Sequence, residues 1–273
     1  MERLWQDLRV LLKARDELHE YFWIESYVDD FDGKEKEIKL AELLEKKKRS
    51  TPLAYIFGNW AFRNLDLLVG PGVLIPRPET EELVDLVLGE VTEVEDKEKI
   101  VFADFGSGSG ALGISIALNL KKKFPEKTII AYCVEQSEAA FEYLKKNVHK
   151  CLRNSQVEMN LLNKSWGDFR EDVDFIVSNP PYVSEKEYSV LMSSVKEHEP
   201  KEALVPAHLQ SNGLESIQEI IENFADKTEF IFFEHGEEQA QKIHSFAESL
   251  RFKSKTFLDL SGKERFTQVL PSE

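Results

Sequence analysis

Strand-like and helix-like segments alternate from residue 99 to the end of the chain, and this alternation constrains the fold more than any other feature. Short apolar runs typical of buried strands are separated by longer segments with apolar residues at helical spacing. We expect strands over 100–105, 128–135, 156–161, 173–178, 228–234, 252–258 and 265–270, and helices over 110–122, 137–149, 213–224 and 237–250. The pattern predicts an α/β fold with a mostly parallel, doubly wound sheet. The connection 259–264 is too short for a crossover helix, so the last two strands should pair antiparallel.

The residues before this region predict two smaller parts. Leucines recur at helical spacing through residues 1–50, with a polar break around Gly33. Thr51-Pro52 ends the helical pattern, and the β-type composition of residues 53–75 predicts strands that form a hairpin. We therefore expect a small N-terminal helical domain over 1–50, a β-hairpin linker over 51–78 and a large α/β domain over 79–273, with a helix that opens at Thr80.

A glycine-rich turn follows the first strand of the α/β region. Its spacing is acid-x-G-x-G-x-G, which differs from the dinucleotide pattern G-x-G-x-x-G, and no lysine follows it as in a triphosphate-binding loop. Glu135 ends the second strand, where a carboxylate can accept both hydroxyls of a ribose. A tight turn and a solvated strand end are the structural alternatives. Together the residues favour a nucleoside ligand without phosphates, and S-adenosylmethionine fits; the candidate cofactor-binding residues are Asp104, Gly106, Ser107, Gly108, Ser109, Gly110 and Glu135.

Trp166-Gly167-Asp168 follows the third expected strand. Trp166 could lie against an adenine ring or simply cap the core, and both interpretations stay open. Asp168 could contact the cofactor or be an ordinary turn residue.

The stretch Asn179-Pro180-Pro181-Tyr182 lies directly after a short apolar run. Two prolines stop any regular structure, which predicts a rigid turn at the carboxyl end of a strand. The Asn179 side-chain oxygen and the Pro180 carbonyl can each accept one hydrogen of a planar NH₂ group and so aim its face at an electrophile. Tyr182 can stack on a flat substrate group. The alternative is a plain loop followed by a core tyrosine.

Charge and cysteine content narrow the classes of function. The formal net charge is −15, so tight non-specific binding to a nucleic-acid backbone is not expected. The 2 cysteines form no metal-binding pattern, so we expect no metal, and they fit a reducing compartment. Without a signal-like start or a long apolar run, a cytoplasmic location and no membrane contact are expected. His198 could act as a base, although a histidine in a polar loop is more often just solvated.

With these motifs in register, the sequence resembles the release factor glutamine methyltransferases, the PrmC or HemK family, from about residue 40 to the end. Residues 1–35 do not look like the usual family N-terminus, and Glu135 replaces a commoner aspartate. The stretches that carry the resemblance, besides the glycine-rich turn, are Pro52–Gly58, Leu74–Glu81, Phe175–Tyr182, Glu199-Pro200, Ser211–Leu214 and Asp259–Arg265.

The resemblance implies a class I methyltransferase fold, with S-adenosylmethionine as cofactor. It implies transfer of a methyl group to the side-chain amide nitrogen of the glutamine in the GGQ motif of class 1 peptide chain release factors. We expect the protein to be a monomer, although no pattern in the sequence specifies its oligomeric state. The cofactor would contact residues 106–110, Glu135, Trp166 and Asn179. The substrate glutamine would meet Asn179, Pro180, Pro181 and Tyr182, of which Asn179, Pro180 and Tyr182 would be catalytic.

Two other functions remain as alternatives. The same Asn-Pro-Pro-Tyr chemistry serves amino-methyltransferases that act on adenine or cytosine of DNA or RNA after base flipping. The net charge and the elbow around residues 75–81 argue against them. The second alternative is a non-catalytic subunit that binds S-adenosylmethionine to stabilise a partner, and the intact Asn179–Tyr182 stretch argues against it.

Overall fold

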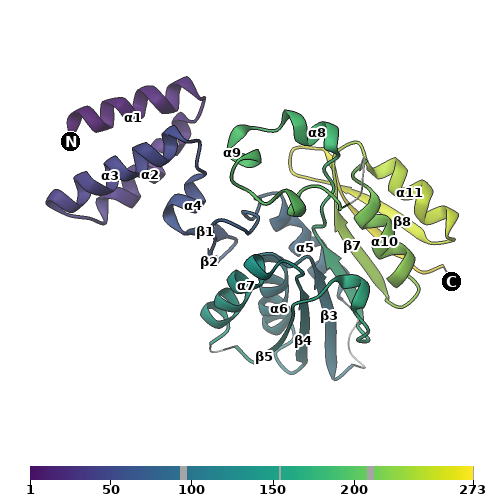
Figure 1. Ribbon diagram of the computed structural model, residues 1–273. Helices are drawn as coiled ribbons and strands as arrows, with labels where there is room; N and C mark the ends of the chain where they lie inside the picture. The colour runs from purple at the N-terminus through teal and green to yellow at the C-terminus, as the bar shows by residue number, and fades with distance from the viewer. Residues whose placement is uncertain (93–96, 154, 208–211, 273) are drawn as a thin grey trace.

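The computed structural model describes residues 1–92, 97–153, 155–207 and 212–272, and a 7-stranded sheet forms its centre (Figure 1). The strand order is β5-β4-β3-β6-β7-β9-β8. The strands are β3 (Lys99–Phe105), β4 (Thr128–Val134), β5 (Val157–Leu162), β6 (Phe175–Ser178), β7 (Phe230–Glu234), β8 (Lys253–Leu258) and β9 (Glu264–Leu270). The predicted mostly parallel α/β sheet is confirmed. The first five of these strands run parallel, and β9 pairs antiparallel with both β7 and β8.

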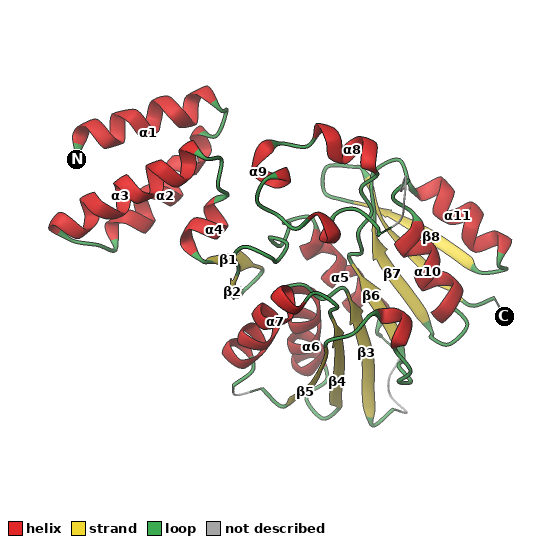
Figure 2. Cartoon of the chain, in the orientation of Figure 1, coloured by secondary structure: helices red, strands yellow, loops and turns green. Residues whose placement is uncertain are grey.

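Helices cover both faces of the sheet, as Figure 2 shows. On one face lie α5 (Thr80–Glu90), α6 (Ala111–Lys123) and α7 (Glu138–Cys151), and on the other lie α10 (Glu215–Phe224) and α11 (Ala240–Ser249). Side chains alternate along β3, so that Phe102 enters the first core while Ala103 and Phe105 enter the second. Phe105 is in register with Ser178, which brings the ends of β3 and β6 side by side. The strand order reverses there, and this is where open α/β sheets bind ligands.

The N-terminal helices form a separate apolar cluster at one end of the molecule (Figure 1). They are α1 (Glu2–Ala14), α2 (Tyr21–Asp29) and α3 (Gly33–Lys48), with a 3-10 turn η1 (Leu18–Glu20) before α2. Their leucines and isoleucine meet in the interior, which confirms the helical spacing. The Lys47 side chain is 2% exposed, and its ammonium group forms ion pairs with Glu17 at 2.8 Å and Glu20 at 2.7 Å.

The expectation of strands throughout residues 53–75 was wrong at both ends. Leu53–Phe57 forms a short helix, α4, because Pro52 starts it and Gly58 ends it with a left-handed φ of 79°. The hairpin itself is shorter and comprises β1 (Asn59–Phe62) and β2 (Leu65–Leu68). Residues 69–79 form no regular element and lead to α5.

The segment after β6 contains short helices that the sequence did not predict. They are α8 (Glu185–Val190), α9 (Ser193–Lys196) and the 3-10 turn η3 (Lys201–Ala203). Figure 1 shows this segment between the N-terminal helices and the sheet, and the His198 Nε2 atom lies 2.8 Å from the Arg49 carbonyl oxygen. Within the described ranges, the helices are all too short or too polar to cross a membrane.

Candidate functional site

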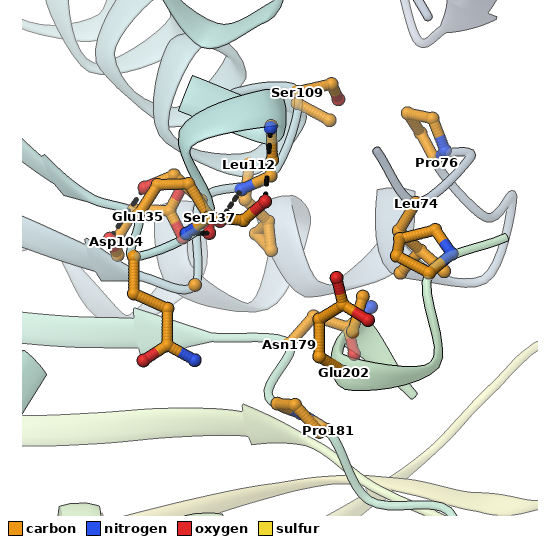
Figure 3. Close-up of a pocket in the computed structure, with 18 of the residues that line it drawn as sticks. Leu74, Pro76, Asp104, Ser109, Leu112, Glu135, Ser137, Asn179, Pro181 and Glu202 are labelled. Atoms are coloured by element: carbon orange, nitrogen blue, oxygen red, sulfur yellow. Dashed lines mark hydrogen bonds between the residues drawn. The ribbon is translucent and has the colours of Figure 1, made fainter. Parts of the chain in front are cut away.

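A pocket opens at the carboxyl ends of β3, β4 and β6, the end of a parallel sheet where ligands bind in open α/β folds. In Figure 3, Asp104 and Glu135 lie on one side of the cavity, Leu74 and Pro76 on the opposite side, and Asn179 and Pro181 below. Most of the residues predicted from the sequence line it together, namely Asp104, Gly106, Ser107, Gly108, Ser109, Glu135, Trp166, Asn179 and Pro181.

The glycine-rich turn joins β3 to α6 and forms one wall of the cavity. Gly110 caps α6 with a φ of 86°, and a Cβ atom there would lie 2.7 Å from Leu144 Cδ1. The left-handed φ favours glycine at this position, and Gly110 itself lies outside the cavity lining. Gly108 has a φ of 55°, and its N–H points at the Glu135 carboxylate. The Ser107 hydroxyl donates to the Asp104 carbonyl oxygen at 2.8 Å and tightens the turn.

Two buried carboxylates face this wall. Asp104 accepts a hydrogen bond from the Gly113 N–H at 2.9 Å, and burial raises the pKa of its carboxyl group to about 7. Glu135 accepts from Gly108 N–H at 2.8 Å through Oε2 and from Ser137 N–H at 2.7 Å through Oε1. Burial raises the pKa of Glu135, while these backbone donors oppose the shift. Each carboxylate oxygen keeps a further lone pair that a ligand hydroxyl can use.

Trp166 lies where the cavity meets the core, so both interpretations from the sequence remain compatible with its position. It lines the cavity and packs in the core cluster with Phe105 and Phe169. The indole Nε1 atom is buried and has no hydrogen-bond partner among the described residues. A buried donor without a partner normally finds one, so an acceptor on a nucleoside ligand would fit here. The donor, the carboxylates and the close-lying backbone suit S-adenosylmethionine.

The Asn179 loop lies across the cavity from the glycine-rich turn. It is fixed to β3 because the Ser178 hydroxyl donates to the Phe105 carbonyl oxygen at 2.7 Å. The Asn179 side chain lines the cavity, and its Nδ2 donates to Thr80 Oγ1 at 3.1 Å. Pro180 is buried and lies outside the lining. Tyr182 lies outside the cavity lining, and its hydroxyl donates to Glu234 Oε1 at 3.0 Å.

A second layer of residues, to which the sequence assigned no role at the site, supports this loop. Thr80 Oγ1 donates to Glu234 Oε2 at 2.6 Å. The Glu199 carboxylate accepts hydrogen bonds from Arg77 Nη2 at 2.7 Å and from the Ile75 N–H at 3.1 Å. These bonds hold the elbow before α5 against the segment that follows β6. The sequence predicts an elbow around residues 75–81 and a helix that opens at Thr80, but no contact between these residues and the site. Glu234 ends a strand beside β6, so the strand-end rule that identified Glu135 could have found it as well.

Two polar residues of open role lie away from the cavity. Asp168 is exposed, and neither it nor His198 lines the cavity. His198 instead contacts the Arg49 carbonyl oxygen at the end of α3. In the parts of the chain that the structure describes, no group of three or more His, Cys, Asp or Glu side chains could hold a metal ion.

Comparison with known proteins identifies the family. Residues 86–222 match the family model described as the methyltransferase small domain. A release factor glutamine methyltransferase from Coxiella burnetii is 33% identical over 265 residues, which cover 94% of this chain and 86% of that protein. One from Bacillus anthracis is 30% identical and covers 85% of this chain and 80% of that protein. One from Fusobacterium nucleatum is 32% identical over 83% of this chain but only 62% of that protein.

Solved structures agree on the fold. The hMettl16 catalytic domain, solved in complex with a MAT2A 3′UTR hairpin, has a TM-score of 0.56 at 16% identity and covers 80% of this chain and 79% of that chain. A methyltransferase from Pyrococcus furiosus has a TM-score of 0.50 at 19% identity and covers 77% of this chain and 90% of that chain. The fold is that of class I methyltransferases, and the cofactor is S-adenosylmethionine. This chain belongs to the release factor glutamine methyltransferase family.

Proposed function

We propose that this enzyme transfers a methyl group from S-adenosylmethionine to the side-chain amide nitrogen of the glutamine in the GGQ motif of class 1 peptide chain release factors. The names of the relatives support this substrate. The observation that carries the proposal is the position of Asn179. Its amide faces a cavity that also contains Glu135 and the glycine-rich turn, so an acceptor for an NH₂ group lies beside the candidate cofactor site.

In this proposal Asn179 and Pro180 orient the substrate. An amide nitrogen is a poor nucleophile, and the enzyme acts mainly through positioning and electrostatics. The Asn179 Oδ1 atom and the Pro180 carbonyl accept the two hydrogens of the substrate NH₂ group. As the new bond forms, the nitrogen gains positive charge, and both oxygens stabilise it more strongly than they stabilise the ground state. Pro181 lines the cavity and would complete the substrate contacts, while Tyr182 holds the loop in place through its hydrogen bond to Glu234.

The cofactor would lie along the other wall of the cavity. When bound, it supplies an electrophilic methyl group. Glu135 would accept the ribose hydroxyls, residues 104–110 would approach the ligand with backbone atoms, and Trp166 would contact the adenine. As the nitrogen–methyl bond forms, the sulfur–methyl bond would break and S-adenosylhomocysteine would leave. The nitrogen would then lose one proton to water and give the neutral N-methyl amide. It becomes acidic enough during alkylation that no strong base is needed beforehand.

The three parts of the chain have separate roles in this proposal. The helical domain over 1–50 docks the release factor, the linker over 51–78 joins it to the catalytic domain, and residues 79–273 carry the chemistry. We further propose that the enzyme acts as a monomer, in the cytoplasm where its substrate works in translation, and makes no direct contact with nucleic acid.

Transfer of labelled methyl groups tests the proposal against its alternatives. The protein is incubated with labelled S-adenosylmethionine and, separately, a class 1 release factor, single-stranded DNA and RNA. The proposal expects label in the release factor. Label in DNA or RNA at a higher rate would favour the nucleic-acid alternative, and no label in any acceptor would favour a non-catalytic subunit. The net charge of −15 favours the protein substrate.

A further inference from the structure

We propose that Glu234 is a positioning residue that decides, through Thr80, which end of the Asn179 amide faces the substrate. The proposal rests on the proposed function for the identity of the substrate. It adds a chain of hydrogen bonds from Glu234 through Thr80 to Asn179. This chain determines whether the oxygen or the nitrogen of the Asn179 side chain faces the cavity.

The chain of hydrogen bonds is short and shielded from water. Asn179 Nδ2 lies 3.1 Å from Thr80 Oγ1, Thr80 Oγ1 lies 2.6 Å from Glu234 Oε2, and Tyr182 Oη lies 3.0 Å from Glu234 Oε1. Thr80 is 4% exposed and Glu234 is 1% exposed. These residues come from the start of α5, the end of β7 and the loop after β6. Three separate elements therefore meet on one carboxylate.

The direction of each bond follows from the number of protons available. An ionised carboxylate can only accept hydrogen bonds, so the single proton of the Thr80 hydroxyl points at Glu234. The Thr80 oxygen can then only accept, and the Asn179 group that faces it must be the NH₂ end. The carbonyl end, Oδ1, is left for the cavity.

This polarity matters because an asparagine amide is nearly symmetrical in shape. Rotation by about 180° exchanges its oxygen and nitrogen with little change in packing, and only hydrogen bonds distinguish the two states. With Oδ1 in the cavity, Asn179 accepts a hydrogen from the substrate NH₂ group. With Nδ2 in the cavity, two donors would face each other and the substrate would be repelled or misoriented.

The groups around Glu234 shift the pKa of its carboxyl group in opposite directions. Burial raises the pKa of its carboxyl group, and Glu79 before α5 adds to the shift, while the hydroxyls of Thr80 and Tyr182 and the Arg265 guanidinium on β9 oppose it. His235 follows Glu234 on the chain, and its ring nitrogens contact the Gly236 carbonyl and Thr267 instead. In the described residues Glu234 has hydroxyl partners and no ion pair. Protonation of the Glu234 carboxylate would therefore not be masked by a bound cation. It would allow Glu234 to donate a hydrogen bond to Thr80 instead of accepting one.

The first test replaces Glu234 with glutamine, which keeps the shape. A glutamine NH₂ can donate to Thr80, whose proton can then turn to Asn179 and reverse the amide. We expect the turnover number at saturating cofactor to fall about 100-fold or more, the effect of losing one preorganised hydrogen bond. Cofactor affinity should stay unchanged. The matched control is Glu229→Gln. Glu229 lies just before the same strand and forms an ion pair with Lys97, and its variant should keep wild-type turnover.

We call the hydrogen bonds from Glu234 through Thr80 to Asn179 the relay. Variants of Thr80 distinguish an effect of the relay on turnover from a general loss of structure. Thr80→Val removes the hydroxyl at nearly constant volume and should lose turnover as Glu234→Gln does. Thr80→Ser keeps the hydroxyl and should restore most of the turnover. The wild-type turnover number should also fall as the pH drops through the raised pKa of Glu234, because a protonated carboxyl can donate to Thr80. Glu234→Gln should lack this acidic limb.

A readout without any substrate keeps the proposal separate from the function. Solvent exchange of the Asn179 side-chain NH₂ protons, measured by NMR and assigned with Asn179→Asp, should be slow in the wild type and faster in Glu234→Gln, although Glu234 makes no hydrogen bond to Asn179. Unchanged exchange, or Glu234→Gln with wild-type turnover and an intact acidic limb, would overturn the relay. If the wild type leaves release factors unmethylated, the proposed function fails, and the exchange measurement still decides the relay.

Discussion

Replacement of Glu135 by alanine is the sharpest test of the cofactor site. The carboxylate is 7% exposed and already accepts the N–H groups of Gly108 and Ser137 at 2.8 and 2.7 Å. In Glu135→Ala these two donors lose their acceptor, and a bound ribose would lose its acceptor as well. A hydrogen bond to a charged group contributes about 1.5–3 kcal/mol.

The loss of two such bonds to the ribose amounts to about 3 kcal/mol or more. The dissociation constant of S-adenosylmethionine should therefore rise by a factor of roughly 150 or more, since each 1.4 kcal/mol is about tenfold. Isothermal titration calorimetry measures this change, and circular dichroism checks that the variant is folded. Glu138→Ala is the matched control, because Glu138 is an exposed carboxylate at the start of α7. An unchanged dissociation constant in folded Glu135→Ala would remove Glu135 from the cofactor site.

Three further outcomes follow from the structure. Asn179→Ala should reduce turnover by about 100- to 1,000-fold, because it removes one preorganised hydrogen-bond acceptor. Calorimetry should find the affinity for the cofactor largely unchanged. Near-normal turnover would show that Asn179 is only a turn residue. Because its pKa is raised to about 7, Asp104 stabilises the fold fully only below its unfolded pKa, and this contribution is lost as the pH rises through about 7. Chemical denaturation of Asp104→Asn should then give a flatter decline of unfolding free energy with pH, and an equal slope would contradict the shift. Lys47→Met leaves Glu17 and Glu20 without their cation, so the free energy of unfolding should fall by more than the ~1 kcal/mol of an exposed ion pair. An unchanged midpoint of chemical denaturation would show that these ion pairs do not stabilise the fold.

The parts of the fold that the sequence predicted are those set by local patterns. The short apolar run of β3 predicts a strand buried on both faces, and in the structure Phe102 enters one core and Ala103 the other. The expectation failed where a segment is short and packed on two sides. Tyr55 and Ile56 have β-type composition, yet they form one helical turn between Pro52 and Gly58, because that conformation buries them in two different clusters.

The candidate site divides in the same way. Asp104, Glu135 and Asn179 could be found because each ends a strand or lies in a distinctive turn. Thr80 and Glu234 form their hydrogen bond across 154 positions of sequence, and one sequence carries no sign of such proximity. The supporting layer of the site therefore depends on the three-dimensional structure.

The central claim is that this enzyme methylates one glutamine of a release factor. Tandem mass spectrometry of a class 1 release factor, incubated with the protein and S-adenosylmethionine, tests it most directly, with Asn179→Ala as the matched control. We predict one added methyl group on the side chain of the GGQ glutamine with the wild type and almost none with the variant. A methyl group on another residue, or a release factor left unmodified while a nucleic acid accepts the label, would contradict the account.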